Sequence, residues 1–258
     1  MHNVETSEAT EDFAKCWQAA IQHIQIQAQG SIESWLRGHL RPPFLEHLSF
    51  RLGNQLFYIR LQDVDDDLDM PGSLNGLFDI ANGTQGHACL MPMRLDKGVW
   101  STTEHGWGLV DAVTGSPVNP PALISDENIV MSDWELQDLA VQVVCSQIKK
   151  EGRELMSWSG DQRINPSLWF VGDDGPEWVV VRAVRYPEKD ALPPSNINEI
   201  QKHLEIQGFH GHFASVAIAN ADDPFDPLVK ENGNFLPLYR GHKMFISYEG
   251  LSQIKGIH

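Results

Sequence analysis

The hydrophobic and polar positions of this chain form a pattern that occurs twice. Residues 12–30 (DFAKCWQAAIQHIQIQAQG) and 133–152 (DWELQDLAVQVVCSQIKKEG) each begin with an Asp-aromatic pair and continue with apolar residues at helical spacing. Each segment ends at a glycine suited to the position that follows a helix. These glycines, Gly30 and Gly152, are 122 positions apart. The pattern therefore predicts two equivalent helices.

A β-hairpin is predicted after each helix. Residues 48–64 (LSFRLGNQLFYIRLQDV) place a Gly-Asn turn between two apolar runs, and residues 167–187 (SLWFVGDDGPEWVVVRAVRYP) place a Gly-Asp-Asp-Gly turn similarly. Within the hairpins, residues 57–60 align with residues 179–182 at a separation of 122. The run EWVVVRAV does not alternate, which is typical of a central strand covered on both faces.

The remaining elements also occur twice. Each hairpin is preceded by a short segment that predicts a strand, although the first of these, SIESWLRGHL, fits a helix equally well. Each hairpin is followed by an acidic loop, a short helix, a strand that starts at a Gly-His pair, and a final strand. The positions that mark these elements are Trp35 and Trp158, Ser73 and Ser195, Gly86 and Gly211, and Trp107 and Lys243.

We therefore predict an α+β fold of two similar α-β-β-β-α-β(β) units with mixed sheets, produced by tandem duplication and related by a pseudo-twofold axis. The predicted boundaries are residues 1–113 for the first unit, 114–132 for a linker and 133–258 for the second unit. The linker contains Pro and Ser and has no sustained period. Its apolar stretch PPALI indicates that it lies against the protein.

The order α-β-β-β-α-β resembles the core of the PD-(D/E)XK nuclease-like superfamily. That family implies a metal-binding Asp on the second strand and an Asp/Glu-x-Lys tripeptide on the third, where the lysine positions the attacking water. The corresponding tripeptides here are Tyr58-Ile59-Arg60 and Val180-Val181-Arg182, so the acid is missing and arginine replaces lysine. The resemblance, which rests on topology, therefore implies degenerate copies of a nuclease core in tandem.

The same order also resembles the small, acidic secretion chaperones of bacteria. These proteins share helix, three strands, helix and two strands, and they bind partner proteins as dimers. A tandem copy would be a covalent version of such a dimer. Element order, size and acidity carry this resemblance, and no diagnostic motif does.

The charge balance argues against nucleic acid as a partner. The chain has 35 Asp plus Glu against 19 Lys plus Arg, a formal net charge of -16, which repels phosphate backbones. No uncharged apolar run is long enough to cross a bilayer, and the acidic amino terminus lacks the features of a signal peptide. Three cysteines without CxxC spacing predict reduced thiols in a cytoplasmic protein. We expect no association with a membrane.

One group of side chains could approach a metal ion. The chain has no HExxH motif and no spaced Cys/His signature, and the two Gly-His pairs predict a structural corner shared by the two units. We therefore predict neither a metal nor a cofactor, and no catalytic residue. The residues considered for the metal are His210, His212, Asp222, Asp223, Asp226 and His242.

An acidic run follows the first hairpin. It includes Asp63, Asp65, Asp67 and Asp69 but lacks the glycine at the sixth position and the glutamate at the twelfth that a calcium loop requires. The run predicts a solvated acidic loop, which could face a basic partner.

Two arginines lie at the same position of the repeat. Arg60 and Arg182 are in strands that should be largely buried, where a guanidinium needs a carboxylate or several carbonyl groups. Glu135 or Asp138 could supply the carboxylate in the second unit. Our interpretation is an internal ion pair that fixes the packing, and the alternative is an arginine that binds a ligand.

Two tryptophans flank the segment STTEHG. Trp100 and Trp107 would be core residues if this segment packs, or aromatic contacts for a partner protein if it is an exposed loop. Core use is the interpretation we prefer.

These observations favour a non-catalytic cytoplasmic module that binds another protein, as an immunity factor, chaperone or regulator, through an acidic surface that meets a basic partner. One alternative is a nuclease-like hydrolase with a displaced metal site made of Asp161, Asp173 and Glu177. The other is a mimic of nucleic acid in which ordered carboxylates replace phosphates.

Overall fold

The chain divides into two compact units, Met1–Asn128 and Ile129–His258. Each unit has a six-stranded sheet and a hydrophobic core of its own. The division falls inside the segment predicted as a linker. The computed structural model describes residues 10–30, 35–37, 40, 47–205, 210–225, 233 and 235–254.

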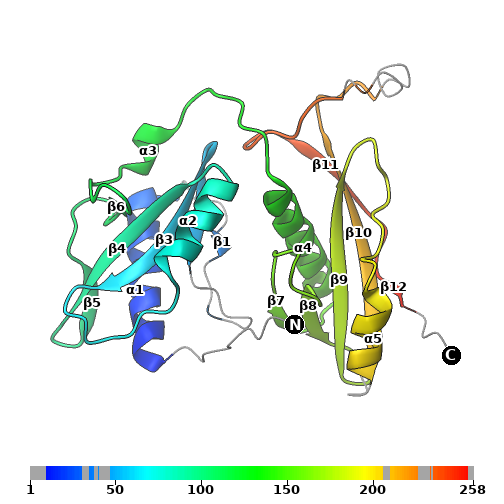
Figure 1. Cartoon of the computed structure of the whole chain (residues 1–258), viewed down its shortest axis with the longest axis horizontal. Helices are drawn as coiled ribbons and strands as arrows, with labels where there is room; N and C mark the ends of the chain where they lie inside the picture. The colour runs from blue at the N-terminus through cyan, green and yellow to red at the C-terminus, as the bar shows by residue number, and fades with distance from the viewer. Residues whose placement is uncertain are drawn as a thin grey trace. The chain divides into compact units, whose positions relative to one another are not determined.

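The first unit consists of a helix, three strands, a second helix and three further strands, followed by one helical turn (Figure 1). The strand order is β1-β2-β3-β4-β5, and β6 pairs with β4. Strands β3 and β4 are parallel and the other pairs are antiparallel. The elements are α1 (Glu11–Ala28), β1 (Trp35–Arg37), β2 (Leu48–Leu52), β3 (Gln55–Asp63), α2 (Leu74–Gly83), β4 (His87–Asp96), β5 (Val99–Thr102), β6 (Val110–Asp111) and α3 (Pro120–Leu123).

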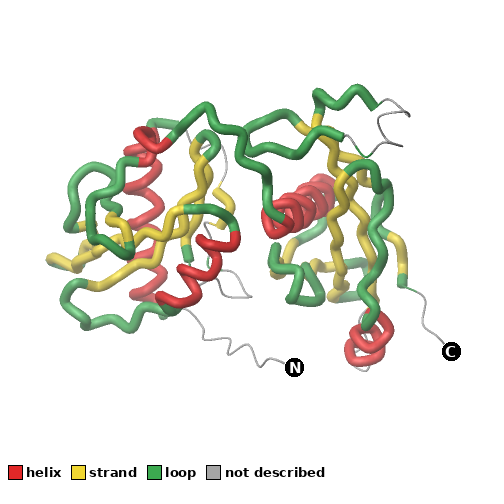
Figure 2. Tube along the Cα trace, turned by 45° about the horizontal axis from the view of Figure 1, so that its top comes forward, coloured by secondary structure: helices red, strands yellow, loops and turns green. Residues whose placement is uncertain are grey.

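The second unit repeats this topology (Figure 2). The strand order is β7-β8-β9-β10-β11, and β12 pairs with β10. Strands β9 and β10 are parallel and the other pairs are antiparallel. The elements are α4 (Asp133–Lys150), β7 (Leu155–Trp158), β8 (Leu168–Val171), β9 (Pro176–Arg185), α5 (Ile197–Glu205), β10 (His210–Asn220), β11 (Met244–Tyr248) and β12 (Ser252–Gln253). The predicted α+β class with two mixed sheets is confirmed.

The long helices start in the same way in both units. The side chain of Thr10 accepts a hydrogen bond from the backbone N–H of Phe13, and Ser132 accepts one from Glu135. A side-chain oxygen at this position satisfies an N–H that has no partner inside the helix. The two capping residues are 122 positions apart, as the repeat requires, and each helix has 18 residues.

Each long helix packs on one face of its own sheet. In the first unit, Trp17 and Ile24 of α1 share a core with Phe57 and Ile59 of β3. In the second unit, α4 is also fixed to β9 by a polar contact, because the buried amide of Gln137 donates to the carbonyl of Val181 (2.8 Å) and accepts from the N–H of Ala183 (3.2 Å).

The registers of the two sheets are equivalent. Residues that the sequence repeat aligns occupy the same positions in the two hydrogen-bonded ladders, with four extra residues in the hairpin of the second unit. Because register fixes which side chains share a face, aligned residues also point to the same face in both units. The aligned rows are Phe50, Phe57 and His87 in the first sheet, and Leu168, Val179 and His212 in the second.

Two elements of the first unit differ from the prediction. Strand β5 (Val99–Thr102) was not predicted, and it includes the first two residues of STTEHG, whereas residues 103–106 form the expected loop. The strand forms because the pair Lys97-Gly98 adopts left-handed conformations (φ 49° and 82°) suited to a two-residue hairpin. The predicted final strand after Trp107 is reduced to Val110–Asp111. The ambiguous segment after α1 contains the strand Trp35–Arg37.

Most of the predicted linker, residues 114–132, belongs to the first unit. It includes α3, and its end is tied to the turn between β2 and β3. There, the amide of Asn54 donates to Ser125 Oγ (3.1 Å) and to the carbonyl of Glu127 (2.8 Å). These contacts explain why the first compact unit extends to residue 128 in sequence.

In the part of the chain that the structure describes, no helix combines the length and the apolar character that a membrane span requires.

Candidate functional site

One face of the second sheet is open over β10 and β11. From Ala214 to Asn220 the buried side chains of β10 alternate with half-buried ones, and the half-buried set of this stretch is Ser215, Ala217 and Ala219. The helix α5 does not cover these three residues, because it packs with Trp178, Val180 and Phe213 near the amino-terminal ends of β9 and β10. The uncovered part of the face forms a groove of about 720 Å³.

The groove has a flat floor and aromatic walls. Its floor is formed by the small side chains of β10, which occupy little of the space above the strand. Tyr186 and Phe225 meet edge to face at a centroid distance of 5.1 Å, and Phe225 lies 5.9 Å from Phe245 of β11. Phe245 is 57% exposed, a large value for a phenylalanine in a regular strand. The groove therefore presents unused apolar surface.

Phe225 is held in place by a buried carboxylate. Its backbone has a φ of 55°, which is uncommon for a residue other than glycine. One carboxylate oxygen of Asp223 accepts the N–H of Phe225 (2.8 Å), and the other accepts the N–H of Leu236 (2.8 Å). Asp223 therefore fixes the turn that positions this aromatic wall.

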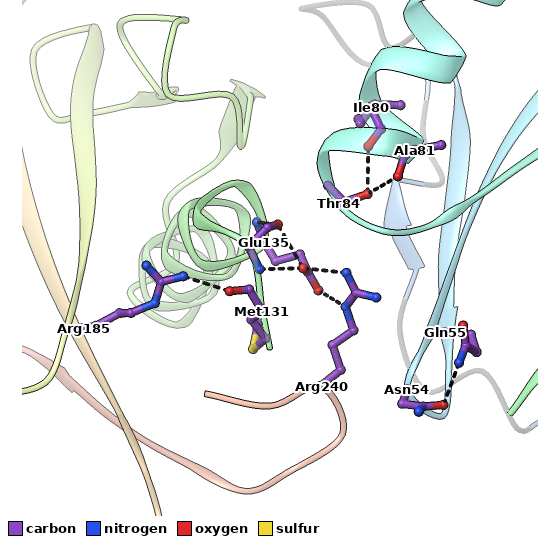
Figure 3. A network of polar contacts seen from close by, with 10 residues as sticks. Asn54, Gln55, Ile80, Ala81, Thr84, Met131, Glu135, Arg185 and Arg240 are labelled. Atoms are coloured by element: carbon purple, nitrogen blue, oxygen red, sulfur yellow. Dashed lines mark hydrogen bonds and ion pairs between the residues drawn. The ribbon is translucent and has the colours of Figure 1, made fainter. Parts of the chain in front are cut away.

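The segment after Leu236 is anchored by a buried ion pair (Figure 3). Arg240 Nε lies 2.7 Å from Glu135 Oε1, and a second guanidinium nitrogen lies 2.9 Å from Glu135 Oε2. The two side chains are 1% and 5% exposed. Glu135 also accepts the N–H of Ser132 (2.8 Å), so one carboxylate both caps α4 and fixes this segment. Bidentate Arg–carboxylate pairs combine energy with geometric specificity.

The rim of the groove is acidic. Glu188, Asp190 and Glu249 line it with a single basic residue, Lys189, and all four are exposed. The loop that carries Glu188, Lys189 and Asp190 is fastened to the floor, because the N–H of Ala191 donates to Ser215 Oγ (2.8 Å). Together these residues give an apolar groove with a net negative rim.

Two positions of the groove are polar in the first unit. Because the registers are equivalent, Arg94 occupies the place of Ala219, and Ser101 occupies that of Phe245. Arg94 forms an exposed ion pair with Asp65 (3.3 Å). The units therefore differ in polarity at these two positions, and this difference does not follow from the shared topology.

A second cavity of the second unit is polar. It measures about 580 Å³ and contains a hydrogen-bonded pair in which His212 Nε2 lies 2.6 Å from Glu177 Oε2. The aligned pair of the first unit is His87 and Gln55, at 3.0 Å. The predicted Gly-His corner thus includes a polar cross-strand contact in both units. The cavity is lined by Glu151, Arg153, Asp174, Glu177, His210, His212, Leu251 and Gln253.

The structure does not bring the residues considered for a metal together as a set, although His210 and His212 line the same cavity. His212 pairs with Glu177, Asp223 supports the turn at Phe225, and His242 contacts the ring of Tyr239. Asp226 lies outside the described residues. Within the described ranges, no group of three His, Cys, Asp or Glu side chains could hold a metal ion.

The displaced acids considered for a nuclease have other surroundings. Asp161 binds Arg163 in a bidentate contact, at 3.0 Å and 2.6 Å, and Asp173 is an exposed turn residue. Glu177 is the partner of His212.

The two arginines of the repeat bind carbonyl groups. Arg60 donates to the carbonyls of Gly72 (2.9 Å) and Met70 (3.2 Å). Arg182 donates to the carbonyl of Val181 (2.7 Å) and to Asn165 Oδ1 (2.9 Å), and burial lowers its pKa. The predicted ion pair with Glu135 or Asp138 is therefore wrong. Glu135 is used by Arg240, and Asp138 accepts from Gln142 (2.6 Å).

The two tryptophans that flank STTEHG are core residues. Trp100 and Trp107 are each 8% exposed, and Trp107 stacks on Phe50 at 6.0 Å. The alternative, in which they contact a partner, is not what the structure shows. Strand β5 is the reason, because it turns Trp100 toward α1.

The acidic loop is only partly solvated. Asp65 is half-exposed and bound to Arg94, and Asp67 is exposed. Asp63 is buried and accepts the N–H groups of Asp65, Asp67 and Leu68 at 3.0–3.2 Å. It therefore organises the loop, as Asp and Asn side chains do in many turns.

Sequence reasoning missed the groove. The strand signal in GHFASVAIAN was recognised, but the alternation of small with larger side chains was not used. Ser215, Ala217 and Ala219 alternate with Val216 and Ile218, which indicates a strand whose second face carries almost no side-chain volume. Combined with the exposed Phe245, this pattern could have indicated a groove.

Comparison with known proteins adds one family. A family model described as a domain of unknown function (DUF8840) matches residues 134–254, which is most of the second unit. No curated protein matches the chain, and no solved structure does.

Proposed function

We propose that this chain is a non-catalytic module that binds another protein, and that the groove of the second unit receives an apolar segment of the partner. The observation that carries the proposal is the exposed apolar groove itself, at positions where the first unit has Arg94 and Ser101. A fold repeated within one chain provides an internal reference, because topology alone would give both units the same surface.

The acidic rim indicates which partners fit. Glu188, Asp190 and Glu249 surround the apolar walls, and the chain carries a formal charge of -16. A partner segment with apolar side chains and flanking Lys or Arg would bury its apolar part and place its cations at the rim. Such an arrangement speeds association with a basic partner and repels an acidic one.

Site-specific photocrosslinking tests the proposal. A benzoylphenylalanine is introduced at Phe245, and the matched control carries it at Ser101, the equivalent position of the first unit. In cells that naturally produce the protein, we expect a discrete protein adduct from position 245 that is absent from position 101. No adduct from position 245, or the same adducts from both positions, would contradict the proposal.

The non-catalytic part is tested separately. We expect the purified protein to leave DNA and RNA intact in the presence of magnesium. Cleavage that is abolished by Asp173→Ala would establish the nuclease-like alternative instead.

A further inference from the structure

The groove borders a free edge of the sheet. Strand β11 is the last strand in the order β7-β8-β9-β10-β11, and within the described residues it pairs only with β10. A terminal strand presents a row of N–H and C=O groups that can pair with another chain. The groove and this edge are continuous, since Phe245, Ile246 and Ser247 line the groove and belong to β11.

The edge lacks the features that usually protect such strands. Natural edge strands are commonly short, charged, bulged or interrupted by proline. Strand β11 (MFISY) has no charged residue and no proline, and its five pairs with β10 continue without a register shift. The opposite edge strand, β7, contains a register shift between Leu155 and Ser157. The equivalent edge of the first unit, β5, has four residues, of which Trp100 is buried.

The side chains of β11 would suit an added strand. Phe245 is 57% exposed and Ile246 is 42% exposed, and they lie on opposite faces of the sheet. Beside them, the floor residues Ser215, Ala217 and Ala219 repeat every second position along β10. A neighbouring strand places its side chains with the same period of two, on the same pleated surface.

We propose that the partner segment is an extended peptide that adds to β11 as a further strand, with alternate apolar side chains in the groove and basic residues at the acidic rim. This inference rests on the proposed function and specifies its geometry. Backbone hydrogen bonds to β11 would contribute affinity, and contacts of alternate side chains with the groove would contribute specificity. A helical segment would instead place its apolar residues at intervals of three and four.

A peptide selection distinguishes these possibilities. The bait is the full-length chain, and the probe is a phage library of random twelve-residue peptides. Counter-selection uses the groove variant, which we define as Ala219→Arg with Phe245→Ser, the residues of the first unit at these positions. We expect enriched peptides with apolar residues at every second position and at least one Lys or Arg near an end.

The possible outcomes separate the two proposals. Enriched peptides with apolar residues at intervals of three and four would overturn strand addition and leave the proposed function supported. No enrichment over the groove variant would contradict both. The groove variant is used only if its circular dichroism spectrum and melting temperature match those of the wild type, and Phe245→Ser alone replaces it otherwise.

Backbone methylation tests the pairing itself. The best enriched peptide is synthesised with a single N-methyl group at each position in turn. An added strand uses the N–H of every second residue toward β11, so we expect a loss of at least about tenfold in affinity at alternate positions. Equal tolerance at all positions would overturn strand addition.

Discussion

At the scale of single residues, the buried pair of Glu135 and Arg240 is the most consequential contact. It joins the start of α4 to the segment that follows Leu236, and Leu236 is bound to the carboxylate that holds Phe225. Removing one member of such a pair leaves a buried charge without compensation, which usually costs more than the pair contributes. The wall of the groove therefore depends on a contact 105 residues apart in sequence.

We predict that Arg240→Met destabilises the second unit by about 3–5 kcal/mol, because Glu135 would remain buried and charged. The double variant Glu135→Gln with Arg240→Met should recover most of this loss, since the glutamine keeps the capping position and removes the charge. Urea unfolding monitored by tryptophan fluorescence measures both. The control is Arg163→Met. The side chain of Arg163 is 89% exposed and pairs with Asp161, so its loss should lower the free energy of unfolding by less than about 1 kcal/mol. Equal effects of Arg240→Met and Arg163→Met would refute this account.

The three thiols give a prediction for pH. Burial raises the pKa of Cys16, Cys89 and Cys145 to about 12, whereas an unfolded cysteine ionises near 9. Between these values the unfolded state has lost protons that the folded state keeps, so stability decreases as the pH rises from about 9 to 12. Each thiol contributes about 1 kcal/mol per pH unit in that range.

The measurement is the free energy of unfolding at pH 8.0, 9.5 and 10.5, compared with a variant in which all three cysteines are alanine. The variant should show a smaller decrease with pH. In addition, the rate at which iodoacetamide modifies the thiols of the native protein at pH 8 should be limited by local or global unfolding. Rapid modification of the folded protein would show that the thiols are not buried.

Residue-level predictions from sequence failed at the partners of the buried charges. Arg60 and Arg182 were recognised as cations in largely buried strands that need acceptors, but the acceptors are backbone carbonyl groups and Asn165, which leave no sequence signature. Glu135 was recognised as an available carboxylate, yet its partner Arg240 lies 105 residues later, between β10 and β11. Composition reveals that a buried charge needs a partner and does not reveal which one.

At the scale of elements, the Gly-His corners illustrate how a short motif controls packing. A Cβ on Gly211 would overlap the ring of Trp178, and a Cβ on Gly86 would lie 2.7 Å from the ring of Tyr58. Neither glycine needs an unusual backbone angle, so the requirement is space for an aromatic ring on the preceding parallel strand. The same corner positions His87 and His212 for their cross-strand contacts.

We predict that Gly211→Ala destabilises the second unit by about 1–3 kcal/mol, because the methyl group must displace the buried ring of Trp178. Gly86→Ala should have an effect of the same sign in the first unit. The control is Gly83→Ala at the end of α2, where nothing lies within 4 Å, and which should be neutral or slightly stabilising. Thermal unfolding of the three variants provides the comparison, and a neutral Gly211→Ala would contradict the steric explanation.

Most elements could be predicted because their signals are local. The Asp-aromatic pairs, the glycines at turns and helix ends, and the apolar periods predicted both long helices, both hairpins and the strands that follow the Gly-His pairs. Strand β5 was missed because its turn, Lys97-Gly98, relies on a lysine in a left-handed conformation, for which the sequence offers only the glycine as a signal. The open face of β10 was missed because it depends on where α5 packs, which is a tertiary property.

At the scale of the whole chain, duplication explains the order of elements and divergence explains the groove. The two units share strand order, parallel pair and register, and each has its own core. Their surfaces differ at the positions of Ala219 and Phe245. With this difference, the first unit could serve as a scaffold and the second unit, which has the apolar groove, could serve for recognition.

We predict that residues 1–128 and residues 129–258, produced separately, each fold with a cooperative thermal transition, because each contains a complete sheet and core. A fragment ending at residue 113 should be less stable than the one ending at 128, since it lacks α3 and the contacts of Asn54 with Ser125 and Glu127. Circular dichroism melting distinguishes the three fragments. A fragment 1–128 no more stable than 1–113 would show that these contacts contribute nothing.

The most direct test of the central claim is a calorimetric titration of the best selected peptide into the full-length chain. We predict one peptide per chain, because the apolar groove lies in the second unit, and an affinity at least about 30-fold weaker for the groove variant. The reciprocal variant of the first unit, Arg94→Ala with Ser101→Phe, should bind like the wild type at the original site. Two peptides per wild-type chain, or unchanged affinity of the groove variant, would show that recognition occurs elsewhere on the molecule.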